Sequence, residues 1–570
     1  RVATCDEVGA SIGASWNDAT RRTLREALVA TGSPLAGSTA DRVLPLLDEY
    51  AATWQRVSRE VCLDREPRWT ADDRLLDRAW WCLDERRVEF ESLLERLTQP
   101  DREVVQEAVP VVRELVRVED CRDIVVLSRQ PPLPTADRAE LRAIRRDLAR
   151  ARNADLTGQF PAAFALTARA HARARELGWA SAVASALLRR GNLLHRLGRP
   201  VEAASTAEDA YFAAIDAGAA GVAADAATRL VFLTGYELAQ HAEGKRWWRH
   251  AIAAIRTLEP RPSLRTAHAF VSLADIQYVA GEFVEARANF ERALAIEQEQ
   301  LGPLHTRTAA TLNNLAAIPF ATGDYAAARD LYERALAVEE SVLGAEHPEY
   351  ARTLNNLATV AYITEDMTAA RALYERALAI REKVLGPDHP DLAVNLLSLG
   401  ELRFNAGDLV GARVLCERAL AVSERAFGSS HPDVASARTA LALVFEELGA
   451  GAEARRLLER ALVDLEGALG REHPRLVVTL VQFARIALAE RRSDEADEMA
   501  ARAIAIAEET GTSGKDLAQA RFIRARVLWD ASPAAHEQAI ALARQARDGL
   551  HAEGGDPGEI DRWLAAHAAP

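Results

Sequence analysis

Five histidines recur in the second half of the chain at a fixed step of 42 in the numbering: His305, His347, His389, His431 and His473. Imidazole is a frequent metal ligand and titrates near neutral pH, so the series could indicate metal binding or pH sensing. Neighbouring helices, however, pack about 8–10 Å apart, so equivalent residues of successive units are too distant to share one ion. We therefore predict a structural role, in which each histidine lies at a helix start or in a loop and hydrogen-bonds locally.

Thiol chemistry is the second candidate. Cys5, Cys62, Cys82 and Cys121 lie close to the start of the chain, where four thiols allow three disulfide pairings. Buried free thiols are the alternative, and zinc is disfavoured because no CxxC pair is present. Cys62 and Cys82 flank a predicted helix hairpin, which favours 62–82 with 5–121, although ideal antiparallel helices would leave these two cysteines one to two turns out of level. Cys416 fills a place that sister units give to tyrosine and is predicted to be a small core residue.

Motifs of the common enzyme classes are missing from the sequence. It contains no GxGxxG, HRD or DFG, no HExxH, no GxSxG and no GxxxxGK[ST]. Pairs of aspartate and glutamate are frequent, but 27% of the residues are charged, so solvated helix faces account for such pairs. We expect no catalytic residue, no metal and no cofactor in this chain.

The overall charge and hydropathy narrow the classes of partner. The formal net charge is -14, and no basic stripe of the kind that nucleic acid requires is present. No apolar run of about 20 residues appears, so the sequence predicts no membrane span within the chain. There is no signal peptide, and the sequence begins with Arg1 rather than methionine, so we expect it to be a piece of a longer protein.

The elements that carry these residues follow from the same step of 42. A fixed period of this size indicates one helix-turn-helix unit that is copied and stacked. A weaker step of 40, seen between Gly158 and Gly198, continues it upstream. We predict an all-α fold, a right-handed α-solenoid of helix hairpins preceded by a small N-terminal helical bundle. The predicted parts are a bundle over 1–130, divergent repeats over 137–260, a regular array over 263–549 with a degenerate last copy, and a capping helix over 550–570.

Each unit is predicted to consist of two helices. In the copy that begins at His305, Leu312 and Leu315 recur at helical spacing and mark the buried face of a first helix. A second helix is predicted over 325–342, with the small residues Ala328 and Ala335 facing inward, where they allow close helix approach. Stacked units of this kind make surfaces that hold other molecules, and they do not by themselves supply chemistry.

This unit resembles the tetratricopeptide repeat, in the 42-residue form of kinesin light chains and many bacterial proteins. The resemblance is carried by TLNNLA at 311–316 and 353–358, YERALA at 332–337 and 374–379, and LGPDHP at 385–390. It is strong from about 263 to 505 and covers six copies. It implies a concave face lined by the first helices, with a protein or peptide as the partner.

Two kinds of side chain are predicted to line that groove. Amides can bond a peptide backbone through both donor and acceptor, and aromatic rings give contact area at low entropic cost. The alternative is that the aromatic rings pack against the neighbouring repeat. The predicted groove residues are Tyr278, Asn313, Phe320, Arg352, Asn355, Tyr362 and Phe404.

The segment 1–130 resembles the one that follows the kinase domain in large bacterial serine/threonine protein kinases ending in tetratricopeptide repeats. The matching features are Trp16 with the helix after it, ATG at 30–32, REVC at 59–62, CLDERR at 82–87 and CRD at 121–123. In such proteins a membrane-spanning helix often precedes this segment. The resemblance then implies a chain outside the cytoplasm, tethered upstream, where disulfides persist. The kinase motifs themselves are absent, so this chain is not expected to transfer phosphate.

The sequence therefore favours a sensor or partner-recruiting region of a bacterial serine/threonine kinase whose catalytic domain lies outside the chain. A free-standing cytoplasmic tetratricopeptide adaptor that assembles a protein complex is the alternative. An enzyme with an unrecognised site is a third. The sequence does not identify the ligand, and it does not give the sign of any regulation.

Overall fold

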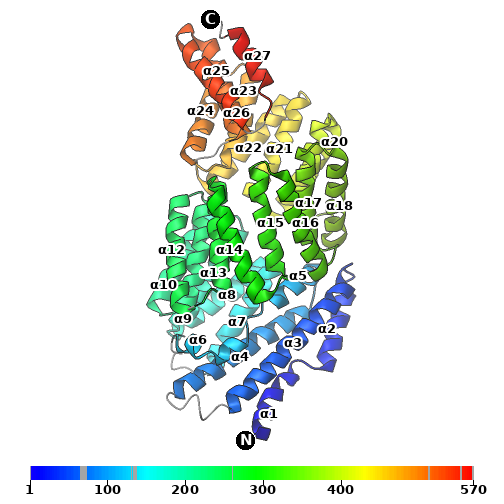
Figure 1. Cartoon of the computed structure of the whole chain (residues 1–570), viewed down its shortest axis with the longest axis vertical. Coiled ribbons are helices and arrows are strands. Elements are labelled where there is room, and N and C mark those ends of the chain that lie inside the picture. The colour runs from blue at the N-terminus through cyan, green and yellow to red at the C-terminus, as the bar shows by residue number, and fades with distance from the viewer. Residues whose placement is uncertain are drawn as a thin grey trace.

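The structure is a computed structural model that describes residues 2–63, 73–129, 131, 138–259, 261–510, 514–552 and 555–567. Helices joined by short turns make up this described part, and no strand occurs in it. The prediction of an all-α solenoid of stacked hairpins is confirmed. The chain runs from a bundle at one end of the molecule to the last hairpins at the other, so that the two termini lie at opposite ends (Figure 1).

The N-terminal bundle surrounds a core of large side chains that includes Trp54 and Phe90. Asn17 and Asp101 accept hydrogen bonds from backbone N–H groups at the starts of two of its helices, which satisfies donors that a helix start leaves unpaired. Its elements are α1 (Val2–Ala10), η1 (Ser11–Ala14), α2 (Asp18–Ala30), α3 (Ala36–Leu63), α4 (Asp73–Leu97), α5 (Arg102–Arg113), η2 (Glu119–Arg122) and α6 (Ile124–Ser128).

Helix hairpins follow from residue 138 onward. The divergent part comprises α7 (Arg138–Leu156), α8 (Phe160–Glu176), α9 (Ala180–Arg196), α10 (Pro200–Asp216), α11 (Ala220–Leu230), the π-helix η3 (Val231–Glu237) and α12 (His241–Leu258). The regular part comprises α13 (Leu264–Val279), α14 (Phe283–Leu301), α15 (Thr306–Ala321), α16 (Tyr325–Val342), α17 (Pro348–Ile363), α18 (Met367–Leu385), α19 (Leu392–Asn405), α20 (Leu409–Phe427), α21 (Pro432–Glu447), α22 (Gly451–Leu469), α23 (Leu476–Ala489) and α24 (Ser493–Thr510). It is closed by α25 (Lys515–Ala531), η4 (Pro533–Ala535), α26 (His536–Ala552) and α27 (Gly558–His567).

Small residues let the two helices of a unit approach closely. Ala328 and Ala335 are fully buried on α16, and Tyr332 fills the space between them. Gly323, in the turn between α15 and α16, has a φ of 80°, which glycine adopts without steric cost. In the next unit Glu365 takes the same left-handed conformation, with a φ of 62°, although it carries a side chain.

The recurrent histidines lie at or just before the starts of the first helices of their units. His305, His347 and His431 are N-cap residues, whereas His389 and His473 lie in the turns before α19 and α23. In each of the five, Nδ1 accepts a hydrogen bond from the backbone N–H two residues further on, at 3.1–3.2 Å. This bond satisfies an otherwise unpaired donor at the helix start. The predicted local structural role of the five histidines is confirmed.

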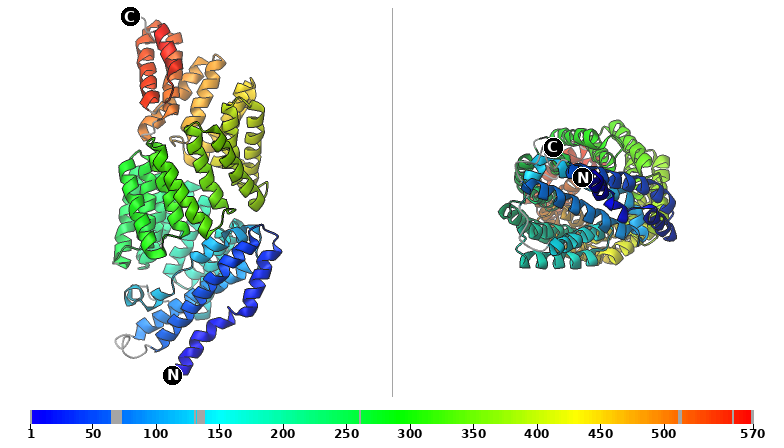
Figure 2. Two further views of the ribbon diagram at one scale, coloured as in Figure 1. Left: turned by 45° about the vertical axis from the view of Figure 1, so that its right-hand side comes forward. Right: turned by 90° about the horizontal axis from the view of Figure 1, so that it is seen from below.

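The hairpins curve around a central axis, and the last of them lie above the first (Figures 1 and 2). Helices α22 and α10 are in contact, although the many hairpins from α11 to α21 separate them in sequence. His473 Nε2 lies 2.6 Å from the carbonyl oxygen of Glu237 at the end of η3. Contacts between the start and the end of the array therefore close it into one turn. We call the contact between His473 and Glu237 the clasp.

The bundle packs beneath the array rather than apart from it. Val342, Leu343 and Val384 of the array belong to the same buried cluster as the bundle core. His347 Nε2 lies 3.1 Å from the carbonyl oxygen of Gln106 on α5. In the view from below, α3 and α4 lie across the near end of the array (Figure 2). A proline cluster at 131, 132 and 134 lies between the two parts in the sequence, and only Pro131 falls within the described residues.

Two disulfides hold the bundle together, Cys5–Cys62 and Cys82–Cys121. The favoured pairing of 62–82 with 5–121 was therefore wrong. Cys62 lies in the last turn of α3, whereas Cys82 lies more than two turns into α4, which puts the two about 12 Å out of level along the hairpin.

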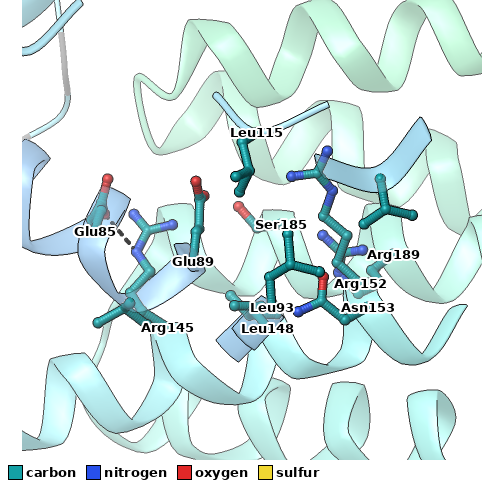
Figure 3. Close-up of a pocket in the computed structure, with 13 residues that line it drawn as sticks. Glu85, Glu89, Leu93, Leu115, Arg145, Leu148, Arg152, Asn153, Ser185 and Arg189 are labelled. Carbon is teal, nitrogen blue, oxygen red and sulfur yellow. Dashed lines mark ion pairs between the residues drawn. The ribbon is translucent and has the colours of Figure 1, made fainter. Parts of the chain in front are cut away.

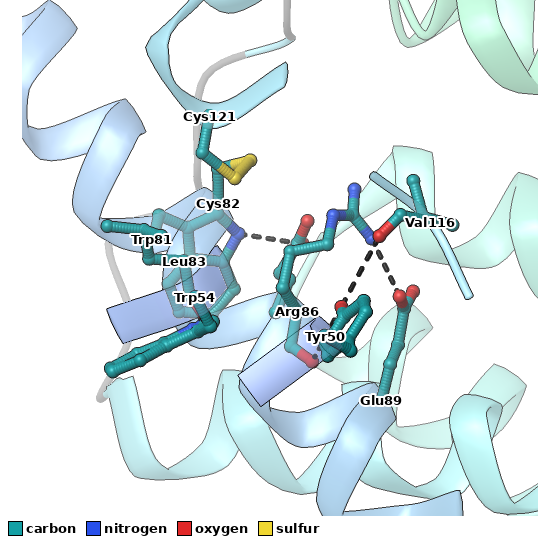
Figure 4. The surroundings of a disulfide bond; sticks show 10 residues. Tyr50, Trp54, Trp81, Cys82, Leu83, Arg86, Glu89, Val116 and Cys121 are labelled. Atoms are coloured by element: carbon teal, nitrogen blue, oxygen red, sulfur yellow. Dashed lines mark hydrogen bonds and ion pairs between the residues drawn. A yellow bond between two sulfur atoms is a disulfide. The ribbon is translucent and has the colours of Figure 1, made fainter. Parts of the chain in front are cut away.

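Each cysteine instead pairs with a segment that packs alongside it. Helix α1 lies against α3, and η2 lies against α4 beside the Cys82–Cys121 bond (Figure 4). Trp54 packs next to this bond and donates a 3.0 Å hydrogen bond to the carbonyl of Leu83. Cys416 is a buried free thiol, as its place in the unit predicted.

Candidate functional site

The first helices of the hairpins form the inner wall of the array. Neighbouring first helices touch one another along α17, α19, α21 and α23, whereas the intervening second helices touch chiefly their own partners and the adjoining first helices. The stack therefore curves with the first helices inside. The half-exposed face of each first helix is the surface that a molecule within the array would meet.

That face carries mostly short and neutral side chains. It repeats at the same three positions of each unit, and we call these positions the inner stripe. The inner stripe is made of Ala310, Asn314 and Ala317 on α15, Arg352, Asn356 and Thr359 on α17, and Val394, Ser398 and Glu401 on α19. Most of these side chains are short, so they leave room for an extended chain to approach the wall.

The two predicted asparagines lie one residue away from the inner stripe. Asn313 and Asn355 are 3% and 6% exposed, and both bond across to the next repeat. Asn313 Nδ2 donates to Thr353 Oγ1 at 2.6 Å, and Asn355 Oδ1 accepts from Asn395 Nδ2 at 2.8 Å. They hold neighbouring repeats together, and the residues that follow them, Asn314 and Asn356, are the half-exposed pair.

The asparagine contact continues into a buried carboxyl group. Thr353 Oγ1 donates to Glu339 Oε1 at 3.0 Å, so that Asn313, Thr353 and Glu339 form one chain of hydrogen bonds across three helices. Burial raises the pKa of Glu339 to about 8. The proton that this carboxyl keeps at neutral pH avoids a buried charge between two repeats.

The four predicted aromatic residues occupy equivalent positions near the ends of their first helices, and all four are half-buried. Tyr278 lies 5.9 Å from Phe283, and Phe320 lies 5.9 Å from Tyr325, as measured between ring centroids. These partners stand at the starts of α14 and α16, so both rings pack within their own unit. Tyr362 accepts a 2.5 Å hydrogen bond from Asn405 in the next unit, and Phe404 packs against a buried cluster that contains Cys416 and Leu441.

Arg352 is the one charged side chain among the predicted groove residues. It lies on the inner stripe, and its Nε lies 3.0 Å from Glu349 Oε2, one turn earlier on α17. The structure thus brings Arg352 to the open face together with Asn314 and Asn356. A helical wheel could have shown that residue 314, rather than 313, faces the open side. The buried positions 309, 312 and 316 define the packed side of α15, and residue 314 lies on the opposite side.

A cavity of about 610 Å³ lies where the bundle meets the start of the regular array. The end of α5, η2 and α6 form one side of it, and the starts of α13 and α15 form the other. Arg307 on α15 pairs with Glu114 through two contacts of 2.7 and 2.5 Å, and Arg265 on α13 pairs with Asp225 at 2.9 Å. Burial alone would raise the pKa of Glu114, but its hydrogen bonds to Arg307 hold that pKa below the usual range.

The described residues contain no group of three or more His, Cys, Asp or Glu side chains placed to hold a metal ion. Among the helices of the described ranges, none is long and apolar enough to cross a membrane. The geometry of the inner wall is that of a binding surface: a curved row of short side chains, amide groups and half-buried rings.

The fold and this wall define a solenoid of helix hairpins, a class of protein that holds other molecules on its inner face. More narrowly, residues 264–463 are tetratricopeptide repeats, since that repeat family matches 264–341, 307–383, 349–413 and 394–463. No curated protein matches the chain at a significant level.

Solved structures show similar arrays. TPR-like repeats from Podosopora anserina, ascribed to a kinesin light chain, share 26% identity over 37% of this chain and 99% of theirs, with a TM-score of 0.31. A Rap protein complexed with competence and sporulation factor shares 16% identity over 60% of this chain and 93% of its own, with a TM-score of 0.39. The apo quorum sensor NprR from B. thuringiensis shares 13% identity over 58% and 88%, with a TM-score of 0.41.

Proposed function

We propose that the inner wall of the array binds an extended segment of a partner protein. The observation that carries this proposal is the inner stripe, which runs along successive first helices and leaves short side chains and amides accessible. An extended peptide offers a backbone donor or acceptor about every 3.3 Å, and amide side chains such as those of Asn314 and Asn356 can bond either. The half-buried rings at the ends of the same helices add apolar contact area.

The asparagines of this proposed binding surface differ from those of the groove that was predicted from the sequence. Asn314 makes no side-chain hydrogen bond to the rest of the described chain, and its amide is therefore available to a ligand. Asn356 Nδ2 donates to Asn313 Oδ1 at 2.8 Å, which leaves its own amide oxygen as an acceptor. Arg352 lies one turn before Asn356 on α17, where its guanidinium is paired with Glu349 and its remaining N–H groups can donate to a peptide carbonyl.

We propose further that this chain is the sensor or partner-recruiting region of a bacterial serine/threonine kinase whose catalytic domain lies outside it. The support is the group of motifs at 59–62, 82–87 and 121–123, which contain three of the four disulfide cysteines. Disulfides persist outside the reducing cytoplasm, which favours a tethered, extracytoplasmic chain. A free-standing cytoplasmic adaptor remains the second candidate function.

Peptide selection tests the binding proposal. Peptides are selected from a random library against the full chain, and their affinity is then measured for two variants. Ala317→Glu places a charge in the inner stripe, and Val410→Glu places the same charge on α20, where the valine is 62% exposed. We expect Ala317→Glu to weaken binding about tenfold or more because a carboxylate would be desolvated beneath the peptide, while Val410→Glu binds as before. Equal affinities of both variants and the parent chain would remove the inner stripe as the binding surface.

Thiol titration separates the two candidate functions. The protein is isolated from its own host without reductant, denatured and titrated. The kinase-sensor proposal predicts one free thiol, that of Cys416, because the other four cysteines are paired. Five free thiols would favour the cytoplasmic adaptor. The codons upstream of Arg1 provide an independent check, since the sensor proposal requires a kinase and a membrane helix there.

A further inference from the structure

A small cavity of about 140 Å³ lies inside the molecule where the bundle meets the divergent hairpins. Helices α4, α5, α7 and α9 surround it, and it is separate from the inner stripe. Its polar lining, drawn in Figure 3, consists of Glu85 and Glu89 on α4, Arg145, Arg152 and Asn153 on α7, and Ser185 and Arg189 on α9.

The two acidic residues of the lining already have cationic partners. Glu85 lies 2.7 Å from Arg145, and Glu89 lies 2.7 Å from Arg86. Two guanidinium groups, those of Arg152 and Arg189, remain without a carboxylate partner in the described part of the chain. Arg152 donates one hydrogen bond, of 3.0 Å, to a backbone carbonyl, and this bond leaves its charge unneutralised.

Hydrogen-bond donors of the lining are also unmet. Arg189 Nε and Asn153 Nδ2 are both buried without a hydrogen-bond partner among the described residues, and Asn153 is 7% exposed. Burial, together with the neighbouring Arg152, lowers the pKa of Arg189 to about 10. A buried donor without an acceptor costs about 1–3 kcal/mol, and a second cation nearby adds to that cost.

Three acids act electrostatically on these cations without forming an ion pair with them in the described part of the chain: Glu89, Glu114 and Asp155. Glu89 is already paired with Arg86, and Glu114 with Arg307. Asp155 follows Asn153 on α7 and acts electrostatically on Arg189, but it does not line the cavity and forms no ion pair with it. Within the described ranges, Asp155 Oδ1 is itself buried without a hydrogen-bond partner. Figure 3 shows Arg152, Arg189 and Asn153 grouped at one end of the cavity, away from the Glu85–Arg145 pair.

We infer that this cavity is a binding site for a phosphate-sized oxyanion, held by Arg152, Arg189 and Asn153. Guanidinium groups match phosphate oxygens in charge and in geometry. Two guanidinium groups and an amide supply more donors than a planar carboxylate accepts, which favours a tetrahedral anion. Arg152 also lines the 610 Å³ cavity, so the anion would enter from there. The inference does not depend on peptide binding to the inner stripe.

Titration of the full chain with inorganic phosphate at constant ionic strength tests the site, with binding followed by calorimetry and thermal unfolding. Two variants remove a charge from the cavity, Arg189→Gln and Arg152→Gln. Arg190→Gln is the matched control, because Arg190 is the next residue of α9 and is exposed. We expect the parent chain and Arg190→Gln to bind phosphate equally, and each cavity variant to bind it about tenfold more weakly or worse.

Circular dichroism establishes that each variant is folded, and if Arg189→Gln does not fold, Arg152→Gln decides. Failure of the parent chain to bind phosphate at millimolar concentration would overturn the inference. So would equal binding by the parent and both cavity variants. Succinate is titrated in parallel, and its binding in preference to phosphate would overturn the assignment to a tetrahedral anion.

Discussion

His347 offers a quantitative test of how the bundle is held to the array. Pro110 has no N–H, so the carbonyl of Gln106, one turn earlier on α5, lacks its helical partner. The imidazole of His347 takes that place, with Nε2 3.1 Å from this carbonyl while Nδ1 caps α17. His389 Nδ1 accepts the equivalent backbone bond, from Asp391 in the turn just before α19, and His389 makes no hydrogen bond to the described part of the bundle.

The comparison of His347→Ala with His389→Ala therefore isolates the docking bond. Loss of either Nδ1 hydrogen bond costs about 1 kcal/mol. His347→Ala also leaves the Gln106 carbonyl unpaired in a buried place, at a further cost of about 1–3 kcal/mol. Hydrogen exchange of the α5 amides measures the difference directly, because these amides exchange when α5 leaves the array. We expect exchange about 5- to 150-fold faster in His347→Ala than in His389→Ala. Equal exchange rates in the two variants would refute this account of docking.

The same contact should depend on pH. Burial lowers the pKa of His347 below its ordinary value near 6.5, and a protonated Nδ1 can no longer accept the bond from Glu349. The unfolded state then binds the proton more tightly than the folded state. The stabilisation by His347 is complete above about pH 6.5 and is lost as the pH falls toward the lower, folded pKa. In His347→Ala, exchange of the α5 amides should lose this part of its pH dependence.

Three further outcomes are expected. Replacement of the 82–121 disulfide by two alanines should lower stability by about 4 kcal/mol, measured from the urea midpoint, because the bond joins cysteines whose sequence separation is 39. Gly198→Ala should lower the melting temperature more than Gly178→Ala; both glycines have positive φ, but a Cβ at 198 would meet the ring of His431 at 2.3 Å, whereas one at 178 meets nothing within 4 Å. Asn313→Ala should cost about 1–3 kcal/mol in urea unfolding through its lost bonds to the next repeat, and Asn314→Ala should cost almost nothing.

The sequence predicted the hairpins because their determinants are local and repeated. Ala328 and Ala335 in one unit have counterparts in Ala370 and Ala377 of the next, and each copy strengthens the same interpretation. Among the predicted groove residues Arg352 lies on the inner stripe, whereas Asn313 and Asn355 fall one residue away from it, since adjacent positions on a helix differ by about 100°.

Features that depend on how distant segments meet could not be predicted in this way. The disulfide pairing depends on the relative level of α3 and α4 and on where α1 and η2 pack. The unpaired guanidinium of Arg189 looks in the sequence like any other arginine, because its lack of a partner among the described residues arises from four helices that converge on one cavity.

The clasp between Glu237 and His473 constrains how this array can evolve. Tandem repeats commonly gain or lose whole units through duplication and deletion, and an open solenoid tolerates either. Here the separation of the two partners in sequence is 236. Deletion of one unit between them would place Lys515, which lies one full repeat beyond His473, at the position that the histidine now occupies. Relatives of this protein that keep the clasp are therefore expected to keep the same number of units between its two ends.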